Sequence, residues 1–345
     1  MMKIKHIHID TYKIFNDFDI DFCENSTPLD LVVITGVNGC GKTTLLKDII
    51  YGSLNPAGEN SSITIDKDGI QHTIKLPHRL YKVIDYSQLH YFSASETKLD
   101  LLESVIIKYV DKMVYENGKT SYDAYAEIQK LLDDIFMGFN LQIRFHGIDR
   151  DKKLIFVNTD DQQFGIKSLS GGEKQILAKV FTLFTDEMKN STVLMDEPEE
   201  SLHPSWQSCL VPVLRRCSKE NNIQFILATH SPQIIASARK EEIRLLTRDE
   251  NNKLNVFSCE QGAYGWTVDR VLREIQKAQY IRVPEVEEKL EFLNNMIEAN
   301  QYESSSFKTI FSEMETLLGY SDQDLVLMRM EIMRKKKKHE KNNKA

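Results

Sequence analysis

The sequence predicts an α/β fold: a mixed, largely parallel sheet around a glycine-rich loop, with an inserted helical lid and a helical C-terminal region. An apolar run, residues 31–34, leads into a glycine-rich segment and then into an apolar stretch with helical spacing, residues 44–50. Two further apolar runs, 191–195 and 223–228, are separated by a helical stretch through residues 206–216. Strands that alternate with helices usually form a parallel sheet whose ligands bind at the carboxyl ends of the strands.

The first element along the chain is expected to be a β-hairpin. Residues 4–10 and 15–22 alternate between apolar and polar side chains, which is the period of a strand with one buried face. His6 and His8 then share one face of the first strand. We interpret them as part of a polar strand face, because the sequence shows no third metal ligand beside them.

The glycine-rich loop at residues 36–43 has the spacing of a phosphate-binding loop. Its glycines let successive backbone N–H groups converge on phosphate oxygens at the N-terminus of the following helix. In this pattern the lysine reaches the β- and γ-phosphates, and the threonine hydroxyl binds Mg²⁺. The sequence therefore predicts that the chain binds a nucleoside triphosphate. The predicted nucleotide-binding residues of this segment are Gly36, Asn38, Gly39, Cys40, Gly41, Lys42, Thr43 and Thr44.

The insert after this loop contains two predicted amphipathic helices. Residues 97–140 carry apolar side chains at spacings of three and four. The stretch is too short and too poor in heptads for a long coiled-coil arm, so we expect a compact helical lid.

Charged side chains follow each of the two later strands. Asp196 and Glu197 come directly after residues 191–195, where one carboxylate could hold Mg²⁺ and the other could polarise an attacking water as a general base. His230 follows the strand at 223–228, where a neutral imidazole could contact the γ-phosphate or the water. Each feature alone is common after a buried strand, so neither decides the function by itself.

A serine and two glycines at residues 170–172 stand at the N-terminus of another predicted helix and form a second candidate anion site. Two phosphate-binding segments, a carboxylate pair and a histidine in this order resemble the ATP-binding-cassette (ABC) ATPases over roughly residues 1–240. The resemblance implies an ABC-ATPase head that hydrolyses ATP, with ATP and Mg²⁺ as cofactors.

The resemblance also assigns a role to each matching residue. Lys42 holds phosphates and takes part in catalysis, while Thr43 and Asp196 serve Mg²⁺. Glu197 is similar to the catalytic glutamate, and His230 to the switch histidine.

Other parts of the site are implied to come from a second copy or from a Q-loop. Ser170, Gly171 and Gly172 match the signature motif, which caps the ATP held by another protomer, so a homodimer or a higher even-numbered assembly is implied. Gln88 is a candidate for the Q-loop glutamine, but residues 91–94 could equally occupy that place.

Features outside the motifs favour the soluble RecF-like, SMC-like and OLD-like branch over a transporter subunit. Residues 198–204 read Pro-Glu-Glu-Ser-Leu-His-Pro, a D-loop similar to that of RecF, OLD-nuclease and bacterial-defence ATPases. The opening strand pair close to residues 12–15 resembles that of RecF and SMC-like proteins, and the helical insert is longer than transporter subunits usually carry. Residues 264–272 and 284–286 resemble ATPases paired with nucleases in Septu-type and retron-associated anti-phage systems.

The resemblance implies an ATPase that senses nucleic acid or phage and controls a partner nuclease or another defence protein encoded nearby. The spacing of Asp322 and Asp324 matches the Asp-x-Asp of an OLD Toprim domain, but they lie in a predicted helical region with little chain after them, so we expect no nuclease centre. A RecF-like DNA-repair ATPase is the alternative, and an ABC transporter ATPase subunit is a further one.

The amino-acid composition limits the functions and the cellular location that the sequence allows. The chain has 345 residues, of which 41% are hydrophobic, and no apolar run approaches a membrane span, so no membrane partner is expected. We expect a cytoplasmic protein, because the N-terminus lacks the apolar block of a signal peptide and the five cysteines are widely spaced. The net charge of −7 excludes a uniformly basic nucleic-acid surface.

The expected domain organisation has three parts. Residues 1–240 form the ATPase head, 241–333 a partly helical region, and 334–345 a basic, disordered tail. The tail could contact phosphates of DNA or RNA.

Overall fold

The computed structural model describes residues 2–52, 61–75, 88–93, 99–139, 141–151, 153–183 and 188–342. The chain divides into two compact units, residues 1–276 and 277–345, which we call the head and the C-terminal unit. We expected the head to end at residue 240, which is too early. Two further strands, β14 (Ile243–Arg248) and β15 (Leu254–Ser258), continue its central sheet and therefore belong to it.

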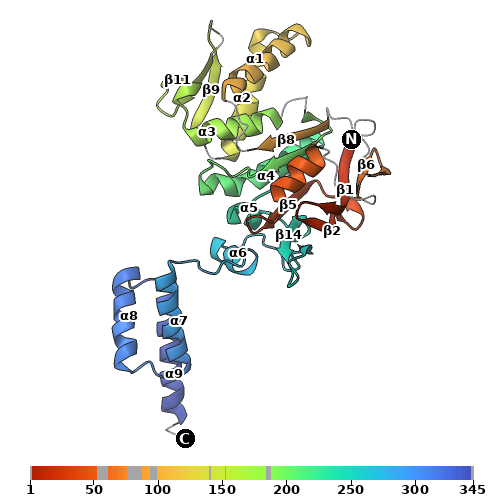
Figure 1. Ribbon diagram of the computed structural model, residues 1–345. Coiled ribbons are helices and arrows are strands. Elements are labelled where there is room, and N and C mark those ends of the chain that lie inside the picture. The colour runs from red at the N-terminus through yellow and green to blue at the C-terminus, as the bar shows by residue number, and fades with distance from the viewer. Residues whose placement is uncertain are drawn as a thin grey trace. The chain divides into compact units, whose positions relative to one another are not determined.

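The central sheet of the head has six strands in the order β15-β14-β5-β13-β12-β8. Its remaining strands are β5 (Leu31–Gly36), β8 (Leu89–Ser93), β12 (Thr192–Asp196) and β13 (Gln224–Ala228). Figure 1 labels β14, β5 and β8 of this sheet. All neighbouring pairs are parallel except β14 with β15. The expected α/β fold with a largely parallel sheet is confirmed, and β5, β12 and β13 are buried along their whole length.

The expected N-terminal hairpin is present. It consists of β1 (Met2–Tyr12) and β2 (Phe15–Asp21), and β6 (Ser62–Lys67) and β7 (Ile70–Lys75) extend it into a sheet ordered β2-β1-β6-β7. A small pair, β3 (Cys23–Glu24) and β4 (Thr27–Pro28), follows β2. The apolar face of this sheet, helix η1 (Thr44–Tyr51) and one face of the central sheet share a single hydrophobic core.

The insert contains the two helices expected from the sequence, α1 (Leu99–Tyr115) and α2 (Ser121–Gly138). It also contains a three-stranded sheet that the sequence did not reveal, built from β9 (Ile143–Ile148), β10 (Leu154–Asn158) and β11 (Gln163–Gly165). The chain then passes through η5 (Ile166–Ser168) into α3 (Gly171–Ile176) and η6 (Leu177–Phe181), which form one continuous helical stretch.

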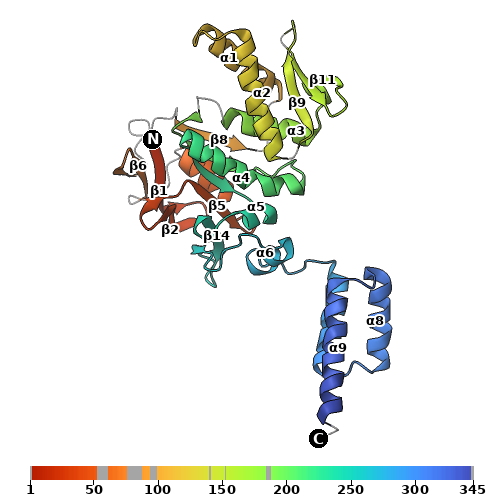
Figure 2. The same cartoon turned by 180° about the vertical axis from the view of Figure 1, so that it is seen from behind.

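The other face of the central sheet packs on the insert and on later helices. The later helices are α4 (Pro204–Asn221), α5 (Pro232–Ser237) and α6 (Val268–Glu274), which Figure 2 shows from behind, and the short η8 (Lys240–Glu242). The apolar side chains of α4, α5 and α6 form the largest hydrophobic core together with those of α2, β10 and η6. This core therefore joins the insert firmly to the strands that end at the candidate site.

The C-terminal unit is a set of three helices, α7 (Pro284–Glu298), α8 (Ser305–Leu318) and α9 (Gln323–Asn342), around a core of its own. Residues 334–342 form the last turns of α9 and not a disordered tail. This helix is held in place because Lys335 Nζ donates to the carbonyl oxygens of the last two residues of α7, Ile297 at 2.7 Å and Glu298 at 3.1 Å. Asp322 and Asp324 both form ion pairs with Arg282, at 2.9 and 2.7 Å.

No helix among the described residues is long and apolar enough to cross a membrane.

Candidate nucleotide-binding site

The glycine-rich loop begins at the end of β5, and close packing from two sides requires two of its glycines, Gly36 and Gly41. A Cβ atom at Gly36 would lie 2.4 Å from the carbonyl oxygen of Leu246 on β14. A Cβ atom at Gly41, where φ is +87°, would lie 2.6 Å from Cδ1 of Ile14 in the turn of the N-terminal hairpin. Any larger residue would move the loop, so the hairpin and β14 together fix its shape.

Lys42 points into this loop. Its Nζ donates to the carbonyl oxygens of Gly36 at 3.0 Å and Val37 at 3.4 Å, and the residue is only 5% exposed. Burial lowers the pKa of Lys42, while the negative charges of Glu197 and Asp196 act in the opposite direction. The ammonium group therefore lies in a partly desolvated place that attracts further negative charge.

The other loop residues differ in their exposure to solvent. Asn38, Gly39 and Thr43 are exposed, Gly41 and Thr44 are half-buried, and Cys40 is buried. The backbone N–H of Leu45 donates to Gly41 O at 2.8 Å, so helical hydrogen bonding starts within the loop. Exposed N–H groups at a helix start can bind an anion, so phosphate binding by this loop stays a prediction.

Asp196 ends β12 and is 8% exposed. Its Oδ2 accepts a hydrogen bond from the Tyr91 hydroxyl at 3.1 Å. Its Oδ1 is buried and has no hydrogen-bond partner among the described residues. A buried carboxylate oxygen without a partner is costly, and a divalent cation would satisfy it. Asp196, with the exposed Thr43 hydroxyl, thus has the oxygen donors that Mg²⁺ prefers.

Glu197 and His230 lie beside each other past the ends of β12 and β13. The distance from His230 Nε2 to Glu197 Oε1 is 4.0 Å, and Glu197 N–H donates to Ala228 O at 2.8 Å. Burial, followed by the charge of Asp196, raises the pKa of the Glu197 carboxyl. Burial and the charge of Lys42 lower the pKa of His230, so its imidazole stays neutral near pH 7.

Glu199 is a central residue of this region that sequence reasoning did not single out. Its Oε1 accepts three hydrogen bonds from the segment after β13: from Thr229 Oγ1 at 2.7 Å, His230 N at 2.8 Å and Ser231 N at 3.0 Å. One carboxylate thereby holds the backbone on which the His230 side chain is carried. The only signal in the sequence is its place in the D-loop, three residues after Asp196.

Lys179 holds the same D-loop from the other side. It lies on η6, is 3% exposed, and its Nζ donates to the carbonyl oxygens of Pro198 at 3.2 Å and Glu200 at 3.4 Å. Burial lowers the pKa of Lys179, while the nearby charge of Glu199 raises it. The helical stretch that starts at the signature motif is therefore linked through Lys179 and Glu199 to His230.

The structure does not place Gln88 at this site. Strand β8 runs parallel to β12 with Leu89 opposite Thr192 and Ser93 opposite Asp196. Gln88 precedes the strand, so it lies at the end of the sheet opposite to Asp196. The alternative stretch, residues 91–94, is nearer, because Tyr91 contacts Asp196 directly. Ala94 lies outside the described residues.

The signature motif forms the exposed start of α3. Ser170 is its N-cap: Ser170 Oγ accepts from Glu173 N at 3.2 Å, and Ser170 N donates to Glu173 Oε2 at 2.6 Å. Gly171 is exposed and its missing side chain faces open space, whereas a Cβ at Gly172 would lie 2.5 Å from the Trp206 ring. The motif thus packs on α4 through Gly172 and presents Ser170 and Gly171 to solvent.

Comparisons with known proteins identify the fold. A family model described as "AAA domain, putative AbiEii toxin, Type IV TA system" matches residues 123–236. The solved SMC head bound to the C-winged helix domain of ScpA has a TM-score of 0.53 and 16% identity, covering 75% of this chain and 98% of that one. The chain has an ABC-type ATPase fold.

Two curated relatives are informative about the branch. The chain is 23% identical to the Septu protein PtuA of Bacillus thuringiensis, covering 87% of this chain and 91% of that protein. It is 27% identical to the "Retron Ec83 probable ATPase" of Escherichia coli over 64% of this chain, but it spans only 42% of that protein. The resemblance to ABC-type ATPases of anti-phage defence is confirmed.

Proposed function

We propose that the chain binds ATP and Mg²⁺ between two copies of itself, hydrolyses ATP, and so controls an effector nuclease or another defence protein encoded nearby. The observation that carries the nucleotide part is the meeting of Lys42, Asp196, Glu197 and His230 at one edge of the central sheet. A cation, two carboxylates and a neutral imidazole beside a glycine-rich loop at a helix start suit phosphoryl transfer to water.

Each of these residues has a distinct task in this proposal. Mg²⁺, held by Thr43 and Asp196, would neutralise phosphate charge. Lys42 binds the phosphates, because its ammonium group is already aimed into the loop. Glu197 takes the proton from the attacking water, a task that its raised pKa favours. His230 stays neutral and orients the water or the terminal phosphate.

The dimer is proposed because the signature motif is exposed. Ser170 forms hydrogen bonds with Glu173 at the start of its own helix, and Gly171 faces open space. A second copy could therefore present this surface to the phosphates, and each site would then consist of two halves. Each nucleotide would thereby hold the two copies together.

The defence role is proposed from the similarity to Septu protein PtuA, which covers most of both chains. Nucleic acid is a possible trigger through the basic end of α9, but part of that charge is already used. Lys335 binds the end of α7, Arg334 pairs with Glu331 at 2.9 Å, and Lys336 pairs with Glu303. Lys337 and Lys338 are exposed and remain the candidate phosphate contacts.

The test uses the full chain expressed with its neighbouring genes. We expect a partner protein to co-purify with it and phage plaques to decrease in number. Co-purification of the partner and the decrease in plaque number should both change in Glu197→Gln. Both should persist in the control Glu220→Gln, which alters an exposed carboxylate on α4. Absence of both a partner and protection would contradict the defence role. ATP-dependent binding to gapped duplex DNA, without any partner, would support the RecF-like alternative instead.

A further inference from the structure

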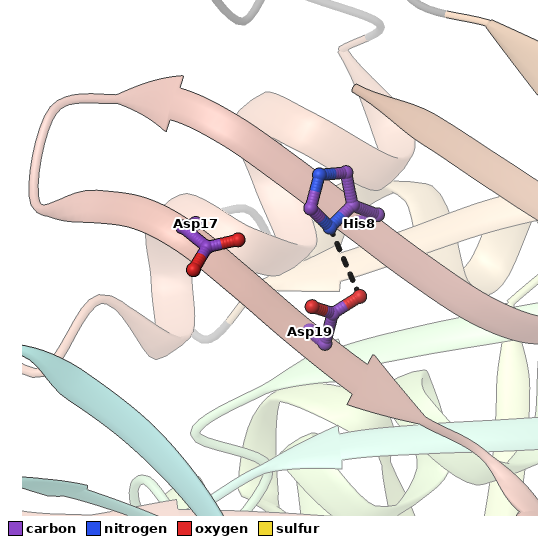
Figure 3. A group of neighbouring side chains, drawn as sticks. All are labelled: His8, Asp17 and Asp19. Carbon is purple, nitrogen blue, oxygen red and sulfur yellow. Dashed lines mark hydrogen bonds and ion pairs between the residues drawn. The ribbon is translucent and has the colours of Figure 1, made fainter. Parts of the chain in front are cut away.

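The outer face of the N-terminal hairpin carries imidazole and carboxylate groups directly opposite each other. In the register of β1 and β2, His8 stands opposite Asp19. His8 Nδ1 lies 3.0 Å from Asp19 Oδ1, and His6 Nε2 lies 3.1 Å from the same oxygen (Figure 3 shows His8, Asp17 and Asp19). The sequence alone gave two histidines without a third ligand, and the hairpin supplies the missing carboxylates.

Asp17 completes a group that can hold an ion. The ligand atoms of His8, Asp17 and Asp19 all lie within 4.8 Å of one another. We propose that these three residues bind a divalent transition-metal ion of the Zn²⁺ type, with His6 as a fourth ligand. This site is separate from the predicted Mg²⁺ site at Asp196 and does not rest on the proposed function.

The donor set decides the class of ion. Imidazole nitrogen with carboxylate oxygen suits Zn²⁺, Co²⁺ or Mn²⁺, whereas Mg²⁺ and Ca²⁺ prefer oxygen ligands alone. Zn²⁺ binds nitrogen and oxygen at about 2.0–2.2 Å, so the ligand atoms must close in from their present spacing. The side chains of Asp17 and Asp19 are 71% and 55% exposed, so they can make this movement without disturbing the core.

One cation competes for the site. Lys253, just before β15, pairs with Asp17 Oδ2 at 2.9 Å, and this pair lowers the pKa of Asp17. An entering ion must displace the ammonium group of Lys253 from Asp17. The neighbouring Asp21 is engaged elsewhere, because its Oδ1 accepts from Cys23 N at 2.9 Å.

An ion bound to the hairpin would also affect the phosphate-binding loop, because the hairpin packs against this loop. The turn between β1 and β2 carries Ile14, which packs against Gly41, and Lys13, whose Nζ pairs with Asp48 on η1 at 2.6 Å. An ion that ties β1 to β2 would stiffen the element that supports the phosphate-binding loop. We therefore expect a higher thermal midpoint with the ion than without it.

The experiment measures binding of Co²⁺ to the full chain without nucleotide, after treatment with a chelator. We expect about one Co²⁺ per chain, with a spectrum free of thiolate-to-metal charge transfer because no cysteine takes part. Asp19→Asn and His8→Ala should each weaken binding by about tenfold or more. His72→Ala on β7 is the matched control, an exposed histidine of the same sheet that should leave binding unchanged.

Two further variants keep the proposal testable if a ligand variant does not fold. Lys253→Ala should tighten Co²⁺ binding, because Asp17 loses its competing cation. Asp196→Asn should leave binding unchanged. The proposal is overturned if Lys253→Ala does not tighten binding, if Asp196→Asn abolishes it, if wild type binds no Co²⁺, or if a thiolate band appears.

Discussion

Glu199→Gln should weaken both the fold and the catalytic site, although Glu199 is not a predicted catalytic residue. The carboxylate Oε1 accepts hydrogen bonds from Thr229 Oγ1, His230 N and Ser231 N at 2.7–3.0 Å. The amide oxygen of glutamine can still accept, but without the negative charge. The substitution also removes the charge that lies near the buried Lys179.

The magnitude follows from these three bonds. Hydrogen bonds to charged groups contribute about 1.5–3 kcal/mol each, and neutral ones about 0.5–1.5 kcal/mol. Replacing three charged hydrogen bonds with three neutral ones therefore lowers the unfolding free energy by roughly 3–4.5 kcal/mol if the loop does not rearrange. Because the His230 backbone is held by the same oxygen, kcat for ATP hydrolysis should also fall, by about 10- to 100-fold.

Urea denaturation and steady-state ATP hydrolysis measure the two effects. Glu200→Gln is the matched control, because it removes the charge of the next residue, which is exposed and which also raises the pKa of Lys179, while the backbone oxygen that Lys179 contacts stays in place. The control should stay within about 0.5 kcal/mol of wild type. If Glu199→Gln also stays within that range and keeps its kcat, Glu199 does not hold the segment after β13 in place.

Three further predictions concern the same site. Glu197→Gln should keep ATP bound but lower turnover by about 10²- to 10⁴-fold, measured by filter binding and phosphate release, because the water loses its base; normal turnover would remove Glu197 from this role. Its stability at neutral pH should rise, because the raised pKa of Glu197 means that its charged form is disfavoured in the fold. Lys42→Ala should weaken ATP binding itself, seen by calorimetry, and an unchanged affinity would contradict the phosphate contact. The lowered pKa of His230 means that the unfolded chain binds the proton more readily, so the free energy of unfolding should decrease as pH falls through the ordinary value of 6.5. His230→Gln should lack this part of the dependence of unfolding free energy on pH, measured by urea titrations at several pH values. The same dependence in wild type and variant would refute the shift.

Local sequence patterns predicted the parts of the site that depend on a strand and the residues just after it. The strand before Gly36, the strand before Asp196 and the strand before His230 all form as expected. The parallel sheet then brings their carboxyl ends together without any further information from the sequence. The roles of these residues in ATP hydrolysis stay predictions.

Features that depend on the pairing of distant segments could not be found in this way. Gln88 was placed wrongly because its distance from Asp196 is set by the register of β8 against β12. Glu199 was overlooked because its partners lie in the segment after β13. The carboxylate opposite His8 was within reach of the sequence, since counting back from the hairpin turn places Asp19 there.

The claim that two copies share each nucleotide site is tested most directly by mixing two inactive variants. Lys42→Ala damages the phosphate loop, and Ser170→Arg blocks the exposed signature motif. If the halves come from different copies, a mixed dimer keeps one intact site, and an equal mixture should recover about one quarter of wild-type ATP hydrolysis. A mixture as inactive as the separate variants would contradict the shared site.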